Sequence, residues 1–283
     1  MISFIVPAYN EEQCLAETLD ALHTTGLALG EAYEILVADD GSTDQTAAIA
    51  LQKGAVLVSV SNRQIAATRN SGARVARGEW LIFVDADTVV SGSVVRGAVD
   101  AMRHGAVGGG AGMRFDEPVP LFARLLLRFI MRMFRWVGLA AGCFLFCTRS
   151  AFSAVGGFDE NYYGAEELVM SRALKRQGKF VILKQTVTTS ARKLRTYSIR
   201  ETLAFMARMA LRGPSALKKR EGMEFWYAER RAPRRSAQRC LTLLYKTIRR
   251  KQIASKSELA GSAGHTLEKL PLPLFAELDP WPS

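Results

Sequence analysis

The sequence predicts an α/β fold in which helices flank a mostly parallel central sheet. Short apolar runs alternate with helical patterns over roughly the first ninety residues, and the connections between them are short. The first run is apolar on both faces, as in a central strand that helices cover from both sides. Acidic side chains follow three of the runs, so we expect them to meet at the carboxyl ends of the strands, where such sheets bind ligands.

Four strands and three helices are expected in this region. The predicted strands are Ile2–Val6, Tyr33–Ala38, Val56–Val60 and Trp80–Val84. Asn10 is expected to cap the first helix and Gly26 to end it. The second helix ends at Gly54, and the third spans Gln64–Ala76. No glycine-rich phosphate loop and no G-x-G-x-x-G follows the first strand, so neither a kinase nor a dinucleotide-dependent dehydrogenase is expected.

The composition limits the partners and the compartment. The chain has 283 residues, a formal net charge of +11 and a pI of about 9.7, so we expect an anionic partner such as nucleotide phosphates or acidic lipid. It carries no signature of a nucleic-acid-binding module, so nucleic acid is not expected. The four cysteines form no C-x-x-C pair, and no uncharged apolar run reaches the length of a membrane span. A cytoplasmic protein is expected, with any membrane contact peripheral and on the inner face.

Asp85 and Asp87 directly follow the fourth predicted strand. In an extended chain residues i and i+2 point to the same side, so the two carboxylates are expected to converge. Converging carboxylates repel each other unless a cation lies between them, and oxygen ligands suit Mg²⁺ or Mn²⁺. Together with the other acidic loops they predict a metal–nucleotide site. The alternative is a pair of solvated loop aspartates.

The pattern is less regular after residue 90. Residues 105–112 are rich in glycine, which fits close approach to a sugar, a plain connection or a glycine-rich strand. Pro118–Trp136 is expected to form a basic amphipathic helix that packs on the sheet, lies in a membrane interface or binds phosphate. Its arginines share one face and are Arg124, Arg128, Arg132 and Arg135. Further elements are expected at Gly142–Thr148 (strand), Glu166–Gln177 (helix) and Phe180–Leu183 (strand).

The C-terminal part is basic. An amphipathic helix is expected at Ser198–Leu211, and Gly213-Pro214 marks a boundary. Basic residues follow together with Phe225-Trp226-Tyr227, which suits a helical appendage on the core or docking on acidic lipid or an anionic acceptor. Residues 252–283 are weakly patterned and are expected to form a tail.

Five short motifs follow the order and spacing of one known family. They are Phe4–Glu11, Val37–Asp44, Arg69–Gly72, Asp85–Asp87 and Gly156–Glu160. Together they resemble the motifs of the inverting family 2 glycosyltransferases of the GT-A fold, over roughly residues 1–195. The resemblance implies a GT-A domain at residues 1–212, with a nucleotide half at about 1–90 and an acceptor half at about 91–212. A basic helical or tail extension then occupies residues 213–283.

The resemblance also implies which residues hold the donor. The residues implied to bind the nucleotide-sugar are Pro7, Ala8, Tyr9, Glu11, Asp39, Asp40, Arg69, Asp85, Ala86 and Arg192. Either Asp39 or Asp40 would hold the base and ribose. Asp85 would contact the ribose or the water shell of the metal, and Asp87, with Asp85, would bind the Mg²⁺ or Mn²⁺ ion that stabilises the departing diphosphate. The alternative for Arg69 is a solvated helix residue.

The catalytic base is implied to lie at the start of the helix at 166–177. Inverting relatives carry a Glu-Asp pair there whose second carboxylate deprotonates the acceptor hydroxyl, whereas this chain has Glu166 and Glu167. Alignment on Gly178 places Glu167 at the base position and alignment on Arg172 places Glu166 there. Adjacent helix residues diverge by about 100°, so only one can face the sugar, and Glu167 is favoured. First-turn carboxylates also suit the helix dipole without any catalytic role. Many relatives have a histidine near Arg192, whose guanidinium would contact the diphosphate directly or lie in a solvated basic loop.

The expected function is transfer of a sugar from a UDP- or GDP-sugar to a hydroxyl group, with a divalent metal and inversion. The acceptor is lipid-linked, a saccharide or a small molecule. Two alternatives remain open. A nucleotidyltransferase would share the sheet and the metal, but would normally carry a glycine- and basic-rich loop where this chain has the acidic Pro7–Glu11. A non-catalytic peripheral membrane protein that retains the fold is the other, because the second residue of the Glu-Asp pair is not Asp.

Overall fold

The computed structural model describes residues 1–116, 121–140, 142–192 and 218. Three predictions lie outside these residues: the helix at Ser198–Leu211, the domain boundary after residue 212 and the basic extension at 213–283. The side chain of Arg124 also lies outside the described part of the chain.

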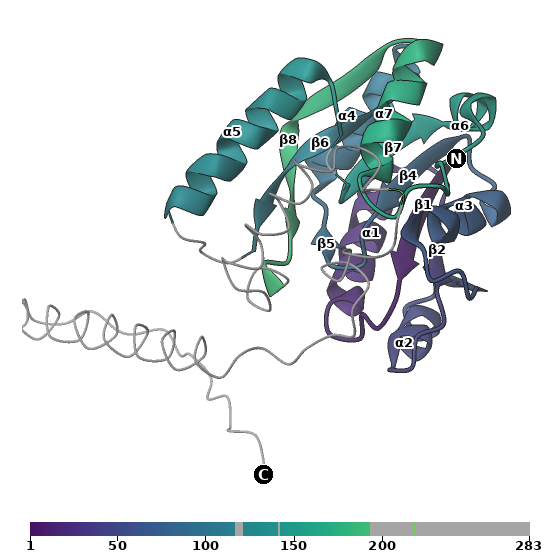
Figure 1. Ribbon diagram of the computed structural model, residues 1–283. Coiled ribbons are helices and arrows are strands. Elements are labelled where there is room, and N and C mark those ends of the chain that lie inside the picture. The colour runs from purple at the N-terminus through teal and green to yellow at the C-terminus, as the bar shows by residue number, and fades with distance from the viewer. Residues whose placement is uncertain (117–120, 141, 193–217, 219–283) are drawn as a thin grey trace, which may run out of the picture. The chain divides into compact units, whose positions relative to one another are not determined.

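An eight-stranded sheet forms the centre of the described part (Figure 1). In chain order its strands are β1 (Ile2–Ala8), β2 (Tyr33–Asp39), β3 (Val56–Ser59), β4 (Trp80–Val84), β5 (Thr88–Val89), β6 (Gly108–Phe115), β7 (Phe144–Thr148) and β8 (Phe180–Thr189). The spatial order is β3-β2-β1-β4-β7-β6-β8-β5. The first half, from β3 to β4, is parallel throughout. In the second half β7 is antiparallel to both neighbours and β6 is parallel to β8, so the expected mostly parallel α/β sheet is confirmed.

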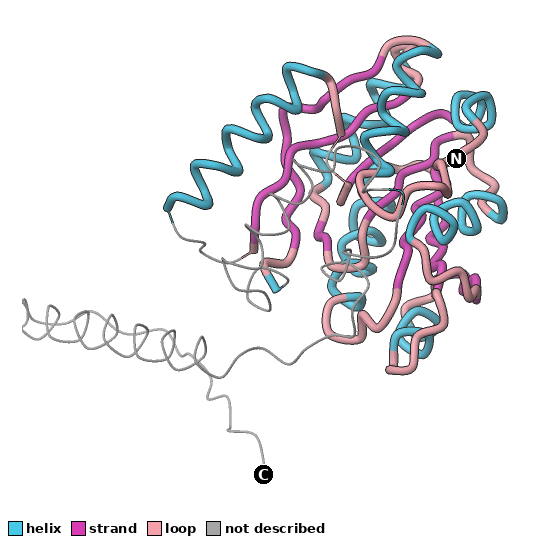
Figure 2. Tube along the Cα trace, in the orientation of Figure 1, coloured by secondary structure: helices cyan, strands magenta, loops and turns pink. Residues whose placement is uncertain are grey.

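Helices cover both faces of the sheet (Figure 2). They are α1 (Leu15–Leu29), α2 (Thr46–Gln52), α3 (Ile65–Val75), α4 (Gly92–Arg103), α5 (Leu121–Val137), α6 (Arg149–Val155) and α7 (Glu166–Gln177). Alternate residues of β1 face opposite layers, because Phe4 packs in the cluster that contains α1 and α4, and Ile5 packs in the cluster that contains α3 and α7. The sheet therefore lies between two cores, and its strand ends are free to carry a site.

The boundaries predicted for the first helix are wrong. α1 begins at Leu15 and continues past Gly26 to Leu29, and Gly30 ends it in the left-handed conformation with φ of 68°. A Cβ atom at Gly26 would lie 2.7 Å from the ring of Tyr33, so this glycine allows close packing inside the helix. Asn10 does not cap α1; its φ is 52°, and it binds the loop after β2 instead.

The glycine-rich segment is a strand, which settles one of the open alternatives. Gly108, Gly109 and Gly110 pair with β7 on one side and β8 on the other. A Cβ atom at Gly109 would collide with the carbonyl oxygen of Val181 and the ring of Phe146. Glycine is required here because neighbouring strands and side chains occupy the space of a side chain.

β8 extends beyond the predicted end at Leu183 and reaches Thr189. The register of β8 against β6 shifts between Ala111 and Gly112 and then continues to the end of β6. Thr188 and Thr189 also pair with β5, a two-residue strand that was not expected. The extra length carries Thr189, and Arg192 just beyond it, to the edge of the sheet where the acidic residues lie.

Candidate active site

Asp39 and Asp40 follow β2 but have different partners. The oxygens of Asp40 accept hydrogen bonds from the backbone N–H groups of Asn62, Arg63 and Gln64 and from the hydroxyl of Thr68. Asp40 therefore fixes the start of α3 in the manner of a helix cap. Asp39 accepts one hydrogen bond from the N–H of Ser42 (3.2 Å) and lies beside Ala8 in the sheet register. Of this pair, Asp39 therefore has fewer side-chain hydrogen bonds than Asp40.

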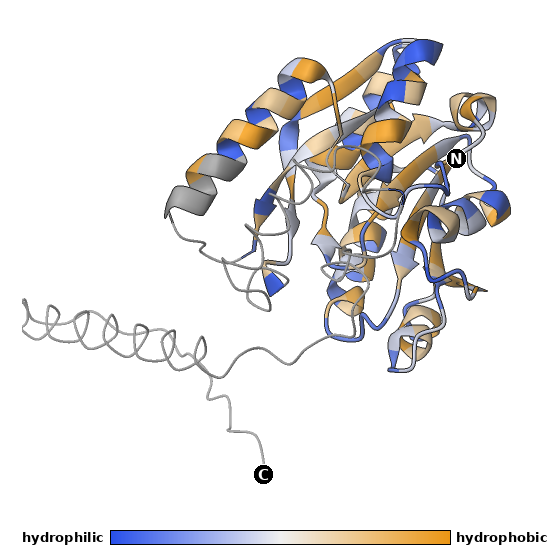
Figure 3. Cartoon of the chain, viewed as in Figure 1, coloured by the Kyte–Doolittle hydropathy of each residue, from blue (hydrophilic) through white to orange (hydrophobic). Residues whose placement is uncertain are grey.

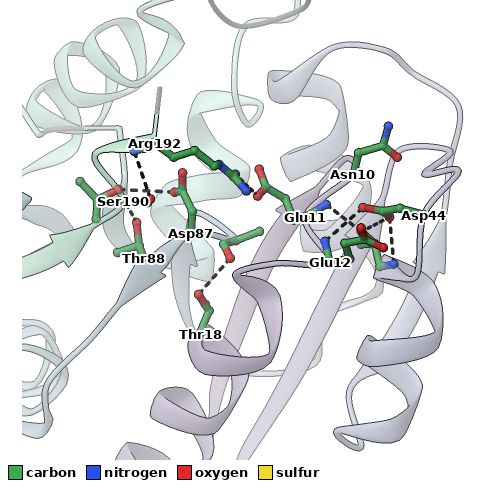
Figure 4. Close-up of polar contacts among 12 residues, drawn as sticks. Asn10, Glu11, Glu12, Thr18, Asp44, Asp87, Thr88, Ser190 and Arg192 are labelled. Atoms are coloured by element: carbon green, nitrogen blue, oxygen red, sulfur yellow. Dashed lines mark hydrogen bonds and ion pairs between the residues drawn. The ribbon is translucent and has the colours of Figure 1, made fainter. Parts of the chain in front are cut away.

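Two loops at the carboxyl end of the sheet are joined by backbone-to-side-chain hydrogen bonds (Figure 4). The N–H of Glu11 donates to the hydroxyl of Thr46 (2.7 Å), and the N–H of Glu12 donates to the Asp44 carboxylate (3.1 Å). The loop after β1 thus has a fixed position relative to the loop after β2 before any ligand binds. Such preorganisation lowers the conformational-entropy cost of ligand binding.

The residues that precede Glu11 lie at the same edge. Pro7 and Ala8 are buried within β1, and the carbonyl of Ala8 accepts the N–H of Asp40 (2.9 Å). Tyr9 is half-buried, and the guanidinium of Arg63 lies 4.5 Å from its ring centroid. An aromatic ring of this kind can stack on a nucleobase.

Asp85, Ala86 and Asp87 do not continue the strand. The N–H of Thr88 donates to the carbonyl of Asp85 (3.0 Å), so residues 85–88 form a turn. The carboxylate of Asp85 binds Arg69 (2.8 Å), whereas that of Asp87 accepts the hydroxyl of Thr189 (3.4 Å). The expectation that residues 85–87 continue the strand in an extended conformation is therefore wrong. Ala86 is buried, and its carbonyl accepts the hydroxyl of Thr18 (2.9 Å).

Arg69 is buried beneath this turn, with 2% of its side chain exposed. Its guanidinium binds Asp85 on β4's turn, Glu166 at the start of α7 (2.5 Å) and the carbonyl of Gly142 (3.0 Å). Burial alone would lower the pKa of Arg69, but the carboxylates of Asp85 and Glu166 outweigh it and raise the pKa. Its Nε has no hydrogen-bond partner among the described residues and the guanidinium lies 5.3 Å from the ring centroid of Phe158. Arg69 is a buried link between three elements and not the solvated residue of the alternative.

Glu166 and Glu167 open α7 in different surroundings. Glu166 is buried in the pair with Arg69, and Glu167 is half-buried, so the two side chains separate as their helix positions require. A Cβ atom at Gly142 would lie 3.2 Å from the Glu167 carboxyl, so this carboxyl lies directly over a glycine. Burial raises the pKa of Glu167 to about 8, and the negative charge of Glu166 adds to the effect.

The carboxyl of Glu167 adjoins the turn at 85–88. Gly142 precedes Cys143, whose carbonyl accepts the N–H of Asp85 (3.3 Å). Burial raises the pKa of the Cys143 thiol, and Asp85, Asp87 and Glu167 all raise it further. All three carboxylates are therefore near one buried point, although they come from β4's turn and from α7.

Arg192 lies across the site from this helix. Figure 4 shows its side chain extending past Asp87 to Glu11, whose carboxylate it binds at 2.5 Å. Burial would lower the pKa of Arg192, but Glu11 raises it and Asp87 adds to the effect. A pocket of about 250 Å³ opens on the other side of Asp87, lined by Thr18, Thr189 and Ser190 among others. The guanidinium is thus available to an anion that reaches Asp87, in exchange for its carboxylate partner.

Two motifs that are distant in sequence meet at Asn70. Its Nδ2 donates to the carbonyl of Phe158 (2.9 Å), and its Oδ1 accepts the N–H of Phe158 (2.9 Å). Gly157 has φ of 82°, and a Cβ atom there would lie 2.8 Å from Oδ1 of Asn70. This contact explains the Gly-Gly-Phe motif as a structural partner of α3. The sequence analysis missed the roles of Gly142 and Thr189, which have no motif of their own.

The described residues contain neither a preformed metal cage nor a helix that could span a membrane. No group of three or more His, Cys, Asp or Glu side chains in residues 1–116, 121–140 and 142–192 is arranged to hold a metal ion by protein ligands alone. Over the same described ranges, every helix is too short or too polar to cross a membrane.

Curated relatives match only part of the chain. Over 96 residues it is 34% identical to the poly(ribitol-phosphate) beta-glucosyltransferase of Bacillus spizizenii. Over 94 residues it is 38% identical to the undecaprenyl-phosphate 4-deoxy-4-formamido-L-arabinose transferase of Pseudomonas aeruginosa. Each alignment covers 31% of this chain, but only 15% and 28% of those two proteins, so it spans less than a third of their length.

Solved structures match over a larger part. TarS 1-349 of S. aureus has a TM-score of 0.54 at 19% identity, covering 77% of this chain and 68% of TarS 1-349. The mannosyltransferase PcManGT of Pyrobaculum calidifontis, solved with GDP-Man and Mn²⁺, has a TM-score of 0.58 at 20% identity, covering 75% of this chain and 64% of PcManGT. At this identity the likeness concerns the fold, and it confirms the expected GT-A fold.

The family is shown by a longer match. Residues 3–153, more than half of the chain, match the family described as "Glycosyl transferase family 2". This range contains the loops after β1, β2 and β4, and Arg69, which links the turn after β4 to α7. The chain therefore belongs to glycosyl transferase family 2.

Proposed function

We propose that this chain transfers a sugar from a nucleoside diphospho-sugar to an acceptor hydroxyl, with inversion at the anomeric carbon. The observation that carries the proposal is the position of Glu167: a half-buried carboxyl with a pKa of about 8, next to the turn that bears Asp87. A general base works best when its pKa lies near the working pH. Glu166 is less suited to the role because Arg69 holds its carboxylate as a buried ion pair.

The donor half of the proposal concerns the loops after β1 and β2. Asp39 is assigned to the base and ribose, with Tyr9 beside it, because Asp40 is committed to the start of α3. TarS has been solved with UDP-GlcNAc and PcManGT with GDP-Man, which makes UDP- and GDP-sugars the first donors to test. Arg192 is assigned to the diphosphate, which would replace Glu11 as its partner.

A divalent ion is assigned to Asp87, beside the diphosphate of the donor. Mg²⁺ and similar ions are often held by one or two carboxylates together with substrate phosphates and water, so a cage of protein ligands is not needed. Asp87 would supply the protein ligand, and Mg²⁺ or Mn²⁺ would neutralise charge on the departing diphosphate. Asp85 is assigned a supporting role, because Arg69 already binds its carboxylate.

The proposed transfer is a direct displacement. The acceptor oxygen forms a bond to the anomeric carbon while the bond from that carbon to the diphosphate oxygen breaks. The proton of the hydroxyl moves to Glu167, and the electron pair leaves with the nucleoside diphosphate, to which Arg192 is assigned as the cationic partner. Attack from the side opposite the leaving group inverts the configuration.

Titration calorimetry of UDP and GDP, each with and without Mn²⁺, tests the donor site. We expect one nucleotide to bind the wild-type chain with Mn²⁺, and Asp87→Ala to weaken this binding at least about tenfold, as loss of a charged metal ligand should. Asp20→Ala is the matched control, because Asp20 is an exposed aspartate in a surface pair with Lys53. If neither nucleotide binds with metal present, donors with other bases are tested, and failure there as well would leave a fold without the activity.

A further inference from the structure

Within the described part of the chain, one helix exposes an apolar face. On α5 the side chains of Leu125, Phe129 and Trp136 are 54%, 66% and 89% exposed, and Met133 is 43% exposed. They follow at spacings of four, four and three residues, so they share one side of the helix. Scattered exposed apolar residues need no explanation, but a continuous stripe usually marks an interaction surface.

The same helix already has an inner apolar face. Ile130, Met131 and Phe134 are half-buried on the opposite side of α5, and Met131 packs against the core cluster. Arg135 holds the helix in place by donating to the carbonyl of Leu183 on β8 (2.7 Å). A surface helix needs only one apolar stripe to pack on a domain. The outer stripe is therefore additional to what the fold requires.

Arginines accompany the outer stripe. Arg128 and Arg132 are exposed, and each directly precedes one of its residues, Phe129 and Met133. At about 100° per residue they form a second row beside the apolar one, and Figure 3 shows blue and orange residues alternating along α5. The described part of α5 contains no acidic residue that would neutralise this row.

The charge decides which partner fits. A second copy of this chain would bring like-charged arginine rows together on molecules that each carry a net charge of +11. An anionic lipid surface instead attracts the arginines and accepts the aromatic and aliphatic side chains between its headgroups. Trp136 suits this position, because indole rings favour the membrane interface.

We propose that α5 docks the protein on an anionic membrane surface through Leu125, Phe129, Met133 and Trp136, with Arg128 and Arg132 on lipid headgroups. This goes beyond the proposed sugar transfer and does not depend on it. The carbonyl of Val137, at the end of α5, accepts a hydrogen bond from Lys175 of α7 (2.7 Å). Docking would therefore bring α7, the helix that begins with Glu166 and Glu167, towards the lipid.

Sedimentation of the full chain with vesicles tests the proposal. We expect binding to vesicles of phosphatidylcholine with phosphatidylglycerol and little binding to phosphatidylcholine alone. The pair Phe129→Ser and Trp136→Ser should weaken binding at least about tenfold, and the pair Arg128→Gln and Arg132→Gln about 10- to 30-fold. Because all four side chains are exposed, these variants should keep the wild-type melting temperature and nucleotide affinity.

Leu27→Ser is the matched control, because Leu27 is 73% exposed on α1 and has no exposed apolar neighbours of this kind on its helix. Equal binding by wild-type and both α5 pairs would overturn the proposal, as would a complete lack of vesicle binding. Light scattering over a range of protein concentrations tests whether a second copy of this chain binds the apolar face of α5 instead. A dimer that the Phe129 and Trp136 substitutions dissociate would identify this face as a contact between copies and would also overturn it.

Discussion

The two halves of the site neutralise their buried carboxylates by different means. In the nucleotide half, Asp40 accepts hydrogen bonds from backbone amides and a hydroxyl of its own neighbourhood. Between the turn after β4 and the start of α7, Asp85 and Glu166 share a single buried guanidinium, that of Arg69. Because the partners of Asp40 all lie at the start of α3, substitution of Asp40 should affect that segment alone. A shared cation couples the turn after β4 to the start of α7, so a change there should reach both.

The two members of each acidic pair have different partners. Asp40, Asp85 and Glu166 are each held by strong partners, as the contacts above describe. Their neighbours Asp39, Asp87 and Glu167 lie at the edge that the nucleotide and acceptor would share. Asp40 holds the backbone at the start of α3, whereas Asp85 and Glu166 hold the side chain of Arg69. The predictions below test this division, beginning with the largest expected effect.

Arg69→Met should destabilise the chain by about 3–5 kcal/mol, because it leaves two carboxylates without their buried partner. Chemical denaturation followed by circular dichroism measures the change. Arg74→Met is the matched control, because Arg74 is an exposed residue of the same helix with one hydrogen bond to Ser71. A loss below about 1 kcal/mol for Arg69→Met would mean that the shared cation does not hold the two halves together.

Glu167→Gln should lower kcat about 10²- to 10⁴-fold, as loss of a general base does. It should also stabilise the fold near pH 8. Below the ordinary pKa of a glutamic acid both folded and unfolded chains keep the proton. As the pH rises towards about 8 only the unfolded chain releases it readily, so the native Glu167 becomes progressively more costly.

The expected gain for Glu167→Gln is on the order of 1 kcal/mol at pH 8, or about 2–4 °C in melting temperature. The gain should vanish near pH 4, and thermal melts at the two values measure it. Glu160→Gln serves as the control, since Glu160 is an exposed carboxylate ahead of the same helix. A variant that loses activity and stability together would argue that Glu167 supports structure instead of chemistry.

The next pair of substitutions compares Asp40 with Asp39. Asp40→Ala should cost about 2 kcal/mol of stability, because several amide donors at the start of α3 lose their acceptor. Asp39→Ala should cost about 1 kcal/mol or less and weaken nucleotide binding about tenfold. Denaturation and calorimetry on both variants measure the two effects. If Asp39→Ala lowered stability more and Asp40→Ala weakened nucleotide binding more, the structural role would belong to Asp39 and the binding role to Asp40.

The sequence located the pairs at Asp39–Asp40 and Asp85–Asp87, because each follows an apolar run that is visible as a pattern, whereas Glu166 and Glu167 were found through the family resemblance. It could not show which member of a pair is tied, since that depends on partners distant in the chain. Arg69 illustrates the reason: its partners Asp85 and Glu166 lie 16 and 97 residues away. The turn after β4 was missed because a hydrogen bond from Thr88, and not the preceding strand, sets the direction of Asp87.

The smallest expected effect concerns Glu166→Gln, which keeps a hydrogen-bonding group for Arg69 but removes a negative charge. That charge helps to raise the pKa of Glu167, so its loss should lower that pKa from about 8. A base must be deprotonated to act, so kcat/KM of the wild-type chain should rise with pH through about 8. In Glu166→Gln this rise should occur about one pH unit lower. An unchanged pH profile would mean that the charge of Glu166 does not influence the pKa of Glu167.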